Sequence, residues 1–193
     1  MSDIIVQKFG GTSVGSDERI SAVAQIIKNA KKDNQVIVVV SAMSGETNRL
    51  INLAKSFGDN PDRREFDALI STGEKVSASL LAMALNSIGV KAKSFSASQI
   101  SMKTTGHHSK AKIIDVDGEK ILATLNDDIV PIITGFQGVT ESGDVTTLGR
   151  GGSDTTAVAI AAHVNATRCD IYTDVDGIYT TDPRVVPEAK KLD

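Results

Sequence analysis

The sequence has little of what would mark a secreted, membrane-bound or nucleic-acid-binding protein. One cysteine, Cys169, in 193 residues excludes an internal disulfide and fits a reducing compartment. The formal net charge of −3 gives no reason to expect nucleic acid or an anionic membrane as a partner. A signal-peptide pattern is missing, and no apolar stretch approaches the roughly 20 residues that span a bilayer. The default expectation is a cytoplasmic enzyme without nucleic-acid or membrane partners.

Several signatures of known chemistry are also missing. Nothing matches the glycine and lysine spacing of a Walker A loop, and a Rossmann fingerprint does not follow the first apolar run. His107 and His108 lie in a polar segment without a metal-ligand pattern, so we assign them to solvent. Asp174 and Asp176 lack the register and the closing glutamate of a calcium loop. Cys169 has no visible catalytic partner and is expected to pack in a sheet. The sequence therefore predicts no metal held by the protein alone.

What is present is an alternation of strand and helix patterns in a chain with 40% hydrophobic and 23% charged residues. Apolar runs predict strands at 4–6, 36–40, 90–95, 129–134 and 171–173. Periodic patterns predict helices at 16–32, 48–57, 66–88 and 118–126. Pro131 should lie at a strand start or an edge, and residues 141–144 should form a hairpin turn. The alternation predicts an α/β fold with a mostly parallel sheet.

Four of the predicted strands end in polar or glycine-rich clusters. These clusters begin at Gly10, Ser41, Gly135 and Thr173. In an open parallel sheet the carboxyl ends of the strands face one crevice, where ligands bind. We therefore expect four segments that are distant in the sequence to meet at one site.

The segment 149–154 reads Gly-Arg-Gly-Gly-Ser-Asp and combines three glycines with a guanidinium, a hydroxyl and a carboxylate. A helical pattern follows at once, with apolar residues at Ala157, Ile160, Ala161 and Val164. A glycine-rich turn that opens a helix leaves backbone N–H groups unpaired at the positive end of the helix dipole, which suits an anion. We therefore expect a phosphate or a carboxylate to bind there.

Charged side chains beside these glycines indicate how the anion is held. Arg150, between two glycines, can bind a carboxylate through two hydrogen bonds. Lys8 precedes a glycine pair, an arrangement that is typical of groups holding a transferring phosphate. Ser153 can serve as a helix N-cap or as an anion ligand, and Asp154 suits the helix dipole. Glu74 follows a helix-breaking glycine, and its pattern alone assigns it no role because exposed glutamates are common on helices.

Five motifs together resemble the aspartate kinase family. They are KFGGTS, STGE, GFQG, TLGRGGSD and TDVDGIYTTDPR, at residues 8–13, 71–74, 135–138, 147–154 and 173–184. Their order and approximate spacing match over the whole chain. The resemblance implies a three-layer αβα sandwich and transfer of the ATP γ-phosphoryl group to the β-carboxylate of L-aspartate. A carboxylate nucleophile has an ordinary pKa of about 3.9 and needs no general base, in agreement with the lack of a candidate base.

The resemblance also implies roles for individual residues. Catalytic roles fall on Lys8, which supplies positive charge to the phosphates, and on Asp154, which orients it. Substrate contacts fall on Ser41, Thr47, Glu74, Phe136, Arg150 and Ser153. Nucleotide contacts fall on Lys8, Gly10, Gly11, Ser13, Gly151, Gly152, Thr173, Asp174, Tyr179 and Arg184. Magnesium is expected to arrive with ATP and not in a protein cage.

The resemblance implies that residues 1–193 form a single catalytic domain that is incomplete at its carboxyl end and lacks the regulatory ACT domains. We expect such a fragment to have little or no turnover, and its open sheet edge to favour a homo-oligomer. Two alternatives remain open. One is another amino acid kinase, acting on glutamate or N-acetylglutamate, and the other is a non-catalytic module that binds a nucleotide or an amino acid.

Overall fold

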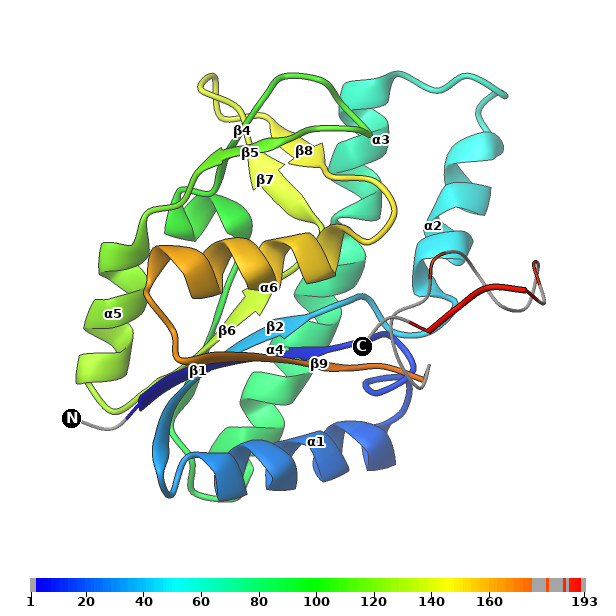
Figure 1. The fold of residues 1–193 in the computed structure, drawn as a ribbon. Helices are drawn as coiled ribbons and strands as arrows, with labels where there is room; N and C mark the ends of the chain where they lie inside the picture. The colour runs from blue at the N-terminus through cyan, green and yellow to red at the C-terminus, as the bar shows by residue number, and fades with distance from the viewer. Residues whose placement is uncertain (1–2, 175–179, 181–185, 187, 192–193) are drawn as a thin grey trace.

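The computed structural model describes residues 3–174, 180, 186 and 188–191. Its main sheet has five parallel strands in the order β3-β6-β2-β1-β9 (Figure 1). Their bounds are β1 (Asp3–Phe9), β2 (Asn34–Val40), β3 (Ala92–Phe95), β6 (Val130–Thr134) and β9 (Arg168–Tyr172). Since all five run the same way, their carboxyl ends share one edge, as the sequence predicts.

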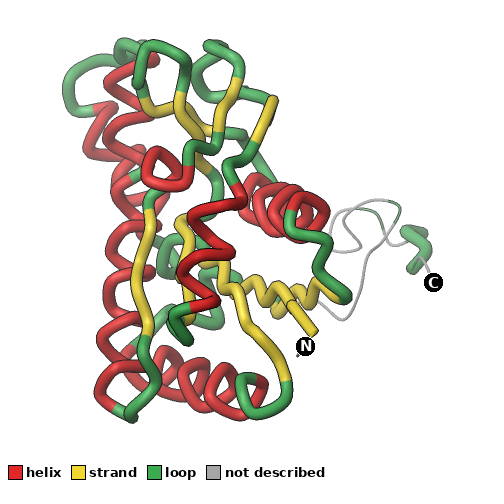
Figure 2. The backbone as a smooth tube through the Cα atoms, turned by 90° about the vertical axis from the view of Figure 1, so that its left-hand side faces the viewer, coloured by secondary structure: helices red, strands yellow, loops and turns green. Residues whose placement is uncertain are grey.

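Helices cover both faces of this sheet. Helices α1 (Asp17–Ala30) and α4 (Thr72–Ser87) pack on one face, and α5 (Gly118–Asn126) and α6 (Gly152–His163) pack on the other. Figure 1 shows α1 below the strands and α6 above them, and Figure 2 shows the same layers from the side. The expected three-layer αβα sandwich is confirmed.

Strand β2 explains why the sheet carries a core on each side. Its run of β-branched residues alternates between the faces, as side chains on a strand must. Val36, Val38 and Val40 join the cluster under α1 and α4, while Ile37 and Val39 join the cluster under α5 and α6. An unbroken apolar run is what a strand covered on both faces requires, and the expectation of a central strand here is confirmed.

Helix α1 begins and ends where its residue types predict. The Ser16 side chain accepts a hydrogen bond from the Arg19 N–H at 3.3 Å, which caps the first turn. Lys28 lies in the last turn, where a cation favours the helix dipole. The apolar stripe faces the core, and its buried members are Ile20, Val23, Ala24 and Ile27.

A second, smaller sheet stands beyond the carboxyl edge, at the top of Figure 1. Its order is β5 (Ile113–Asp115), β4 (Lys103–Thr104), β7 (Gln137–Val139) and β8 (Val145–Thr147). The expected hairpin turn joins β7 and β8, with Gly143 in the left-handed region at φ 90°. Helix α3 (Arg63–Ile70) packs on β8, while α2 (Glu46–Lys55) and the short 3₁₀ helix Ala97–Ile100 complete the described elements.

Three single-residue expectations can be compared with the structure. Pro131 lies at the start of β6, one of the two positions predicted for it, although β6 is an inner strand. His108 is not simply solvated, because its Nδ1 lies 3.1 Å from a carboxylate oxygen of buried Asp67. His107 is exposed as expected.

The membrane expectation also needs correction. By length and composition, the helical stretch Arg63–Ser87 is apolar enough to cross a membrane, whereas the sequence analysis expects no stretch that approaches this length. Half of its most apolar window is buried inside the molecule, as in the core helix of a soluble protein. The stretch also includes Asp67 and Glu74, both buried against other parts of the fold.

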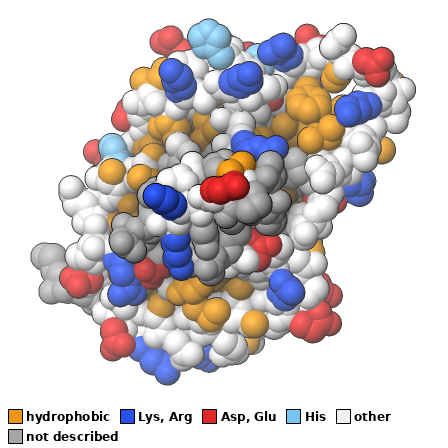
Figure 3. Space-filling model, turned by 45° about the vertical axis from the view of Figure 1, so that its right-hand side comes forward, with side chains coloured by type: hydrophobic (Ala, Val, Ile, Leu, Met, Phe, Trp, Pro, Cys, Tyr) orange, Lys and Arg blue, Asp and Glu red, His pale blue; other side chains and the backbone are white. Residues whose placement is uncertain are grey.

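The face drawn in Figure 3 intersperses charged side chains of both signs with small hydrophobic groups.

A pair of substitutions on α4 tests the core assignment. Leu81 is fully buried in the cluster under α1 and α4, whereas Met83 on the same helix is 59% exposed. We expect Leu81→Ala to lower the free energy of unfolding by about 2–5 kcal/mol, because it removes apolar contacts and leaves a cavity. Met83→Ala should change it by less than about 0.5 kcal/mol. Urea unfolding measures both, and similar losses for the two variants would contradict this packing.

Candidate active site

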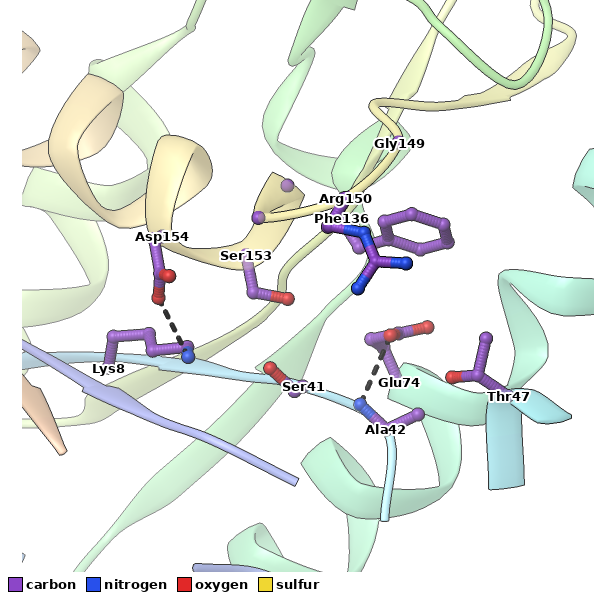
Figure 4. A pocket seen from close by; sticks show the side chains of 12 residues that line it. Lys8, Ser41, Ala42, Thr47, Glu74, Phe136, Gly149, Arg150, Ser153 and Asp154 are labelled. Atoms are coloured by element: carbon purple, nitrogen blue, oxygen red, sulfur yellow. Dashed lines mark hydrogen bonds and ion pairs between the residues drawn. The ribbon is translucent and has the colours of Figure 1, made fainter. Parts of the chain in front are cut away.

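The largest concentration of predicted site residues lines one cavity at the carboxyl edge of the main sheet. The cavity has a volume of about 280 Å³, small for a ligand pocket. Residues from the ends of β1, β2 and β6 meet there with the starts of α4 and α6 (Figure 4). The lining residues are Lys8, Ser41, Ala42, Thr47, Glu74, Phe136, Gly149, Arg150, Gly151, Gly152, Ser153 and Asp154. The expected convergence of distant segments is therefore confirmed for these residues.

Lys8 and Asp154 form the ion pair at the base of the cavity. The Lys8 side chain is 8% exposed, and its Nζ lies 2.7 Å from Oδ1 of Asp154. Lys8 sits on β1 and Asp154 in the first turn of α6, so the pair joins a strand to the helix covering it (Figure 4). A buried ammonium needs such a counter-charge. The contact brings Asp154 to Lys8, and its role in orienting Lys8 stays a prediction.

Glu74 occupies the first turn of α4, and the structure overturns its interpretation as an ordinary exposed glutamate. It is 3% exposed, and its Oε1 accepts the Ala42 N–H at 3.1 Å. Oε2 is buried without a hydrogen-bond partner among the described residues. Burial raises the pKa of Glu74 to about 7, although the Ala42 N–H works in the opposite direction. The carboxyl group is thus poised to change charge near neutral pH.

The start of α4 reaches this position because of a glycine. A Cβ at Gly73 would lie 2.8 Å from the Ala42 Cβ, so a larger residue would push the helix away from the end of β2. Ser77, one turn further along α4, donates a hydrogen bond from its hydroxyl to the Ser41 carbonyl oxygen at 2.7 Å. The sequence singled out neither Ala42 nor Ser77, because their contacts join segments far apart in the chain.

Arg150 projects from the glycine-rich turn that opens α6. Gly149 and Gly151 have φ of 82° and 74°, a conformation that favours glycine. The Arg150 side chain is exposed, and none of the described residues forms a hydrogen bond or ion pair with its guanidinium. In Figure 4 this guanidinium and the Glu74 carboxyl point toward one another across the cavity. The site therefore presents a free cation opposite a buried acid.

Two details of the predicted anion turn are corrected. The N-cap of α6 is Gly151, so Ser153 lies inside the helix and does not cap it. The Gly152 N–H donates to the Gly149 carbonyl at 3.1 Å, and the Gly10 N–H donates to the Tyr172 carbonyl at 3.0 Å. These two amides hold the protein's own turns together. The glycine pattern predicts N–H groups that point freely toward a phosphate, and these two do not.

The remaining predicted nucleotide residues lie beside the cavity or outside the described chain. Gly10 is adjacent to the Lys8 ammonium, since a Cβ on it would lie 3.6 Å from Nζ and 4.0 Å from the Thr173 Cα. A Cβ on Gly11 would lie 2.6 Å from the Ala42 carbonyl oxygen, so close backbone packing explains this glycine. The residues that line the cavity do not include Gly10, Gly11, Ser13, Thr173 or Asp174. Tyr179 and Arg184 lie outside the described residues.

Phe136 closes the cavity in an unusual backbone conformation. Its φ of 68° is uncommon for a residue with a side chain, and its N–H donates to the Thr156 hydroxyl at 3.2 Å. The preceding residue, Gly135, packs closely against Ser153, because a Cβ on Gly135 would lie 2.6 Å from the Ser153 Oγ and 2.9 Å from the Ser153 Cα. The end of β6 is thus fitted against the first turn of α6.

This close fit yields a test at Gly135. We expect Gly135→Ala to lower the free energy of unfolding by about 1–3 kcal/mol, because the new methyl group overpacks the start of α6. Gly106→Ala is the matched control: no atom lies within 4 Å of its Cβ position and its φ is not positive. It should change stability by less than about 0.5 kcal/mol. Urea unfolding of both proteins is the measurement, and a neutral Gly135→Ala would disprove the contact.

Comparisons with known proteins find aspartate kinases that are similar to this chain in sequence and in fold. The aspartate kinase of Pseudomonas putida is 56% identical over 191 residues, covering 98% of this chain and 46% of that protein. The aspartokinase of Geobacillus stearothermophilus is 55% identical over 190 residues, covering 98% and 47%. The structure of Escherichia coli aspartokinase III in complex with aspartate and ADP has a TM-score of 0.86 at 31% identity, over 99% of this chain and 54% of that one. The chain thus spans about half the length of the curated relatives it matches. Residues 3–193 match the Amino acid kinase family, and the chain belongs to that family.

Proposed function

We propose that this chain belongs to an ATP-dependent aspartate kinase, which makes 4-phospho-L-aspartate in the first step of lysine, threonine and methionine biosynthesis. One observation carries the proposal: a guanidinium and a carboxyl group face the same cavity, and the described residues leave the first, and one oxygen of the second, without a hydrogen bond. The Arg150 guanidinium makes no hydrogen bond to any described residue, and the Glu74 Oε2 is buried without one. A free α-amino acid supplies a carboxylate to the first and an ammonium to the second. The names of the similar proteins support aspartate as that amino acid.

In this proposal each lining residue has a defined partner on the substrate. Arg150 binds the α-carboxylate through its guanidinium fork, and Glu74 binds the α-ammonium. Ser41 and Thr47 contact the side-chain carboxylate, and of the two Ser41 lies nearer to Lys8 in Figure 4. Phe136 and Ser153 complete the wall of the substrate site.

The chemical step needs charge neutralisation more than proton transfer. One oxygen of the substrate β-carboxylate attacks the γ-phosphorus, the bond to the β,γ-bridging oxygen breaks, and ADP leaves with that electron pair. The nucleophile is ionised at neutral pH, so no general base takes a proton. Lys8 stabilises negative charge on the transferring phosphoryl group, and Asp154 holds the Lys8 ammonium in place.

The nucleotide belongs on the side of the cavity where β1 and β9 end. We assign its contacts to Lys8, Gly11, Ser13, Gly151, Thr173, Asp174, Tyr179 and Arg184. Gly10 and Gly152, whose N–H groups are engaged within the fold, contribute to this side by lacking a side chain. ADP is present in the similar Escherichia coli complex, which supports a nucleotide substrate. Magnesium enters with ATP as part of the substrate. We further propose a cytoplasmic protein that self-associates as a homo-oligomer.

A ligand panel tests the proposal. Calorimetric titration of the chain with L-aspartate, L-glutamate and N-acetyl-L-glutamate should rank L-aspartate first, since the N-acetylated ligand has no ammonium for Glu74. Arg150→Ala should weaken L-aspartate binding by about 10- to 100-fold, the loss of one pair of charge-assisted hydrogen bonds. A second titration with ATP–magnesium, followed by an assay of ADP release, measures nucleotide binding and turnover.

The matched control for Arg150→Ala is Arg168→Ala. Arg168 is an exposed arginine on β9 that pairs with Asp170 and does not line the cavity. Its removal should leave L-aspartate affinity unchanged. Tighter binding of N-acetyl-L-glutamate than of L-aspartate, or equal losses for the two arginine variants, would contradict the proposed substrate.

A pH series tests the role of Glu74. Its pKa of about 7 means that the free site is protonated at low pH, and the protonated acid cannot pair with an ammonium. The affinity for L-aspartate should fall about 10- to 30-fold from pH 7.5 to pH 5.5, because binding must displace that proton. Calorimetry in two buffers of different ionisation enthalpy should show proton release at pH 6.5. Glu74→Gln should bind weakly at every pH, and a pH-independent affinity in the parent would count against this role.

A further inference from the structure

Asp67 on α3 is a fully buried carboxylate outside the cavity, with 0% exposure. Its Oδ2 accepts the N–H groups of Thr147 and Ser109, both at 2.9 Å, and the His108 Nδ1 lies 3.1 Å away. Its Oδ1 accepts the hydroxyl groups of Thr147 at 2.8 Å and of Ser109 at 3.1 Å. A buried charge is retained only where donors surround it, and here they come from two different segments.

Both segments border the turn that carries Arg150. Thr147 is the last residue of β8 and precedes Arg150 by three positions. Ser109 is held at φ 65°, and its carbonyl oxygen would lie 3.4 Å from a Cβ on Gly149. The Ala111 N–H then donates to the Thr147 carbonyl at 2.9 Å, which ties the two segments to each other. Asp67 therefore fixes both the strand that enters the Arg150 turn and the loop behind it.

The same helix also leads to the acid across the cavity. Helix α3 ends at Ile70, and the Ser71 carbonyl accepts the Gln137 side-chain N–H₂ at 2.9 Å. Helix α4 begins at the next residue and carries Glu74 in its first turn. The Arg150 guanidinium has no hydrogen bond of its own to a described residue, so the backbone of the turn is what fixes the point from which this side chain extends. Asp67 is thus connected to the segments that carry both of the groups facing each other in Figure 4: through Thr147 to the Arg150 turn, and through the end of α3 to the start of α4.

We infer that Asp67 is a positioning residue that sets the separation between Arg150 and Glu74, and so makes the cavity selective for a free α-amino acid over a dicarboxylate without an ammonium. This inference rests on the proposed function. A ligand engages both charges only if their spacing matches the distance between its carboxylate and its ammonium. Losing Asp67 frees the Arg150 turn relative to Glu74, and the ligand then satisfies one charge at a time.

The test compares Asp67→Ala with Asp67→Asn in the whole chain. Asparagine keeps one oxygen for the two backbone N–H groups and can donate its amide N–H₂ to the two hydroxyl oxygens, so it should restore the contacts. Asp117→Asn is the matched control, because Asp117 accepts the Glu119 N–H at 3.0 Å at the start of α5 and does not line the cavity. L-Aspartate and succinate, which lacks the ammonium, are titrated by calorimetry. Amide hydrogen exchange is measured without ligand at Leu148, which follows Thr147 and donates its N–H to the Phe136 carbonyl at 2.9 Å.

In the parent chain L-aspartate should bind more tightly than succinate, because only L-aspartate engages Glu74. We expect Asp67→Ala to lower this ratio of affinities at least about tenfold, while Asp67→Asn and Asp117→Asn stay within about threefold of the parent. Exchange at Leu148 should be faster in Asp67→Ala alone. A merely structural role would lower stability and both affinities together and leave the ratio unchanged. An unchanged ratio with unchanged exchange would overturn the inference.

Two further outcomes remain decisive. If Asp67→Ala does not fold, Thr147→Val removes one hydroxyl donor while keeping the side-chain shape, and should lower the ratio about threefold. An unchanged ratio in that variant would overturn the inference. If the parent binds neither ligand, the proposed function fails for this chain, and exchange alone decides the role of Asp67. Faster exchange at Leu148 in Asp67→Ala than in Asp117→Asn supports it, and equal rates contradict it.

Discussion

The ion pair between Lys8 and Asp154 is the interaction on which the site depends. It places a buried ammonium at the carboxyl edge of the main sheet, and it joins β1 to the first turn of α6 at 2.7 Å. Because the Asp154 side chain is 45% exposed, breaking the pair costs less than the ~3–5 kcal/mol of a fully buried pair. The start of α6, and with it the turn that carries Arg150, is therefore held over the end of β1. The strand order then brings β2 and β6 to the same edge.

At the same edge of the sheet, the burial of the Glu74 carboxyl group lowers the stability of the folded chain at neutral pH. Burial raises its pKa to about 7, so between pH 4.5 and 7 the folded chain binds more protons at this carboxyl than the unfolded chain does. Its contribution to stability therefore falls as the pH rises through this window and stays low above it. A structural residue would avoid this penalty, whereas a group that binds an ammonium gains a counter-charge when the ligand arrives. The unpaired Arg150 guanidinium across the cavity fits the same explanation.

Local patterns predicted the parts of the molecule that are locally determined. The β-branched run of β2, the stripe of α1 with its Ser16 cap, and the glycine turn before α6 each carry their signal within a few residues. The glycine-rich patterns indicated Lys8, Arg150, Ser153 and Asp154, and the resemblance added Ser41, Thr47, Glu74 and Phe136 to the cavity residues. The strands of the small sheet, of two or three residues each, are too short for a periodic signal. The buried state of Glu74 and the contacts of Asp67 depend on residues 32 to 80 positions away, which no local pattern records.

A crystal structure of the chain with bound L-aspartate is the most direct measurement of the central claim, that strand ends distant in the sequence form one cavity for a small zwitterion beside Lys8. The account expects the α-carboxylate within hydrogen-bond distance of Arg150, the ammonium at Glu74, and the side-chain carboxylate directed toward the Lys8 end of the cavity. L-Aspartate bound elsewhere on the chain, or an Arg150 guanidinium turned away from the cavity that holds the ligand, would contradict it.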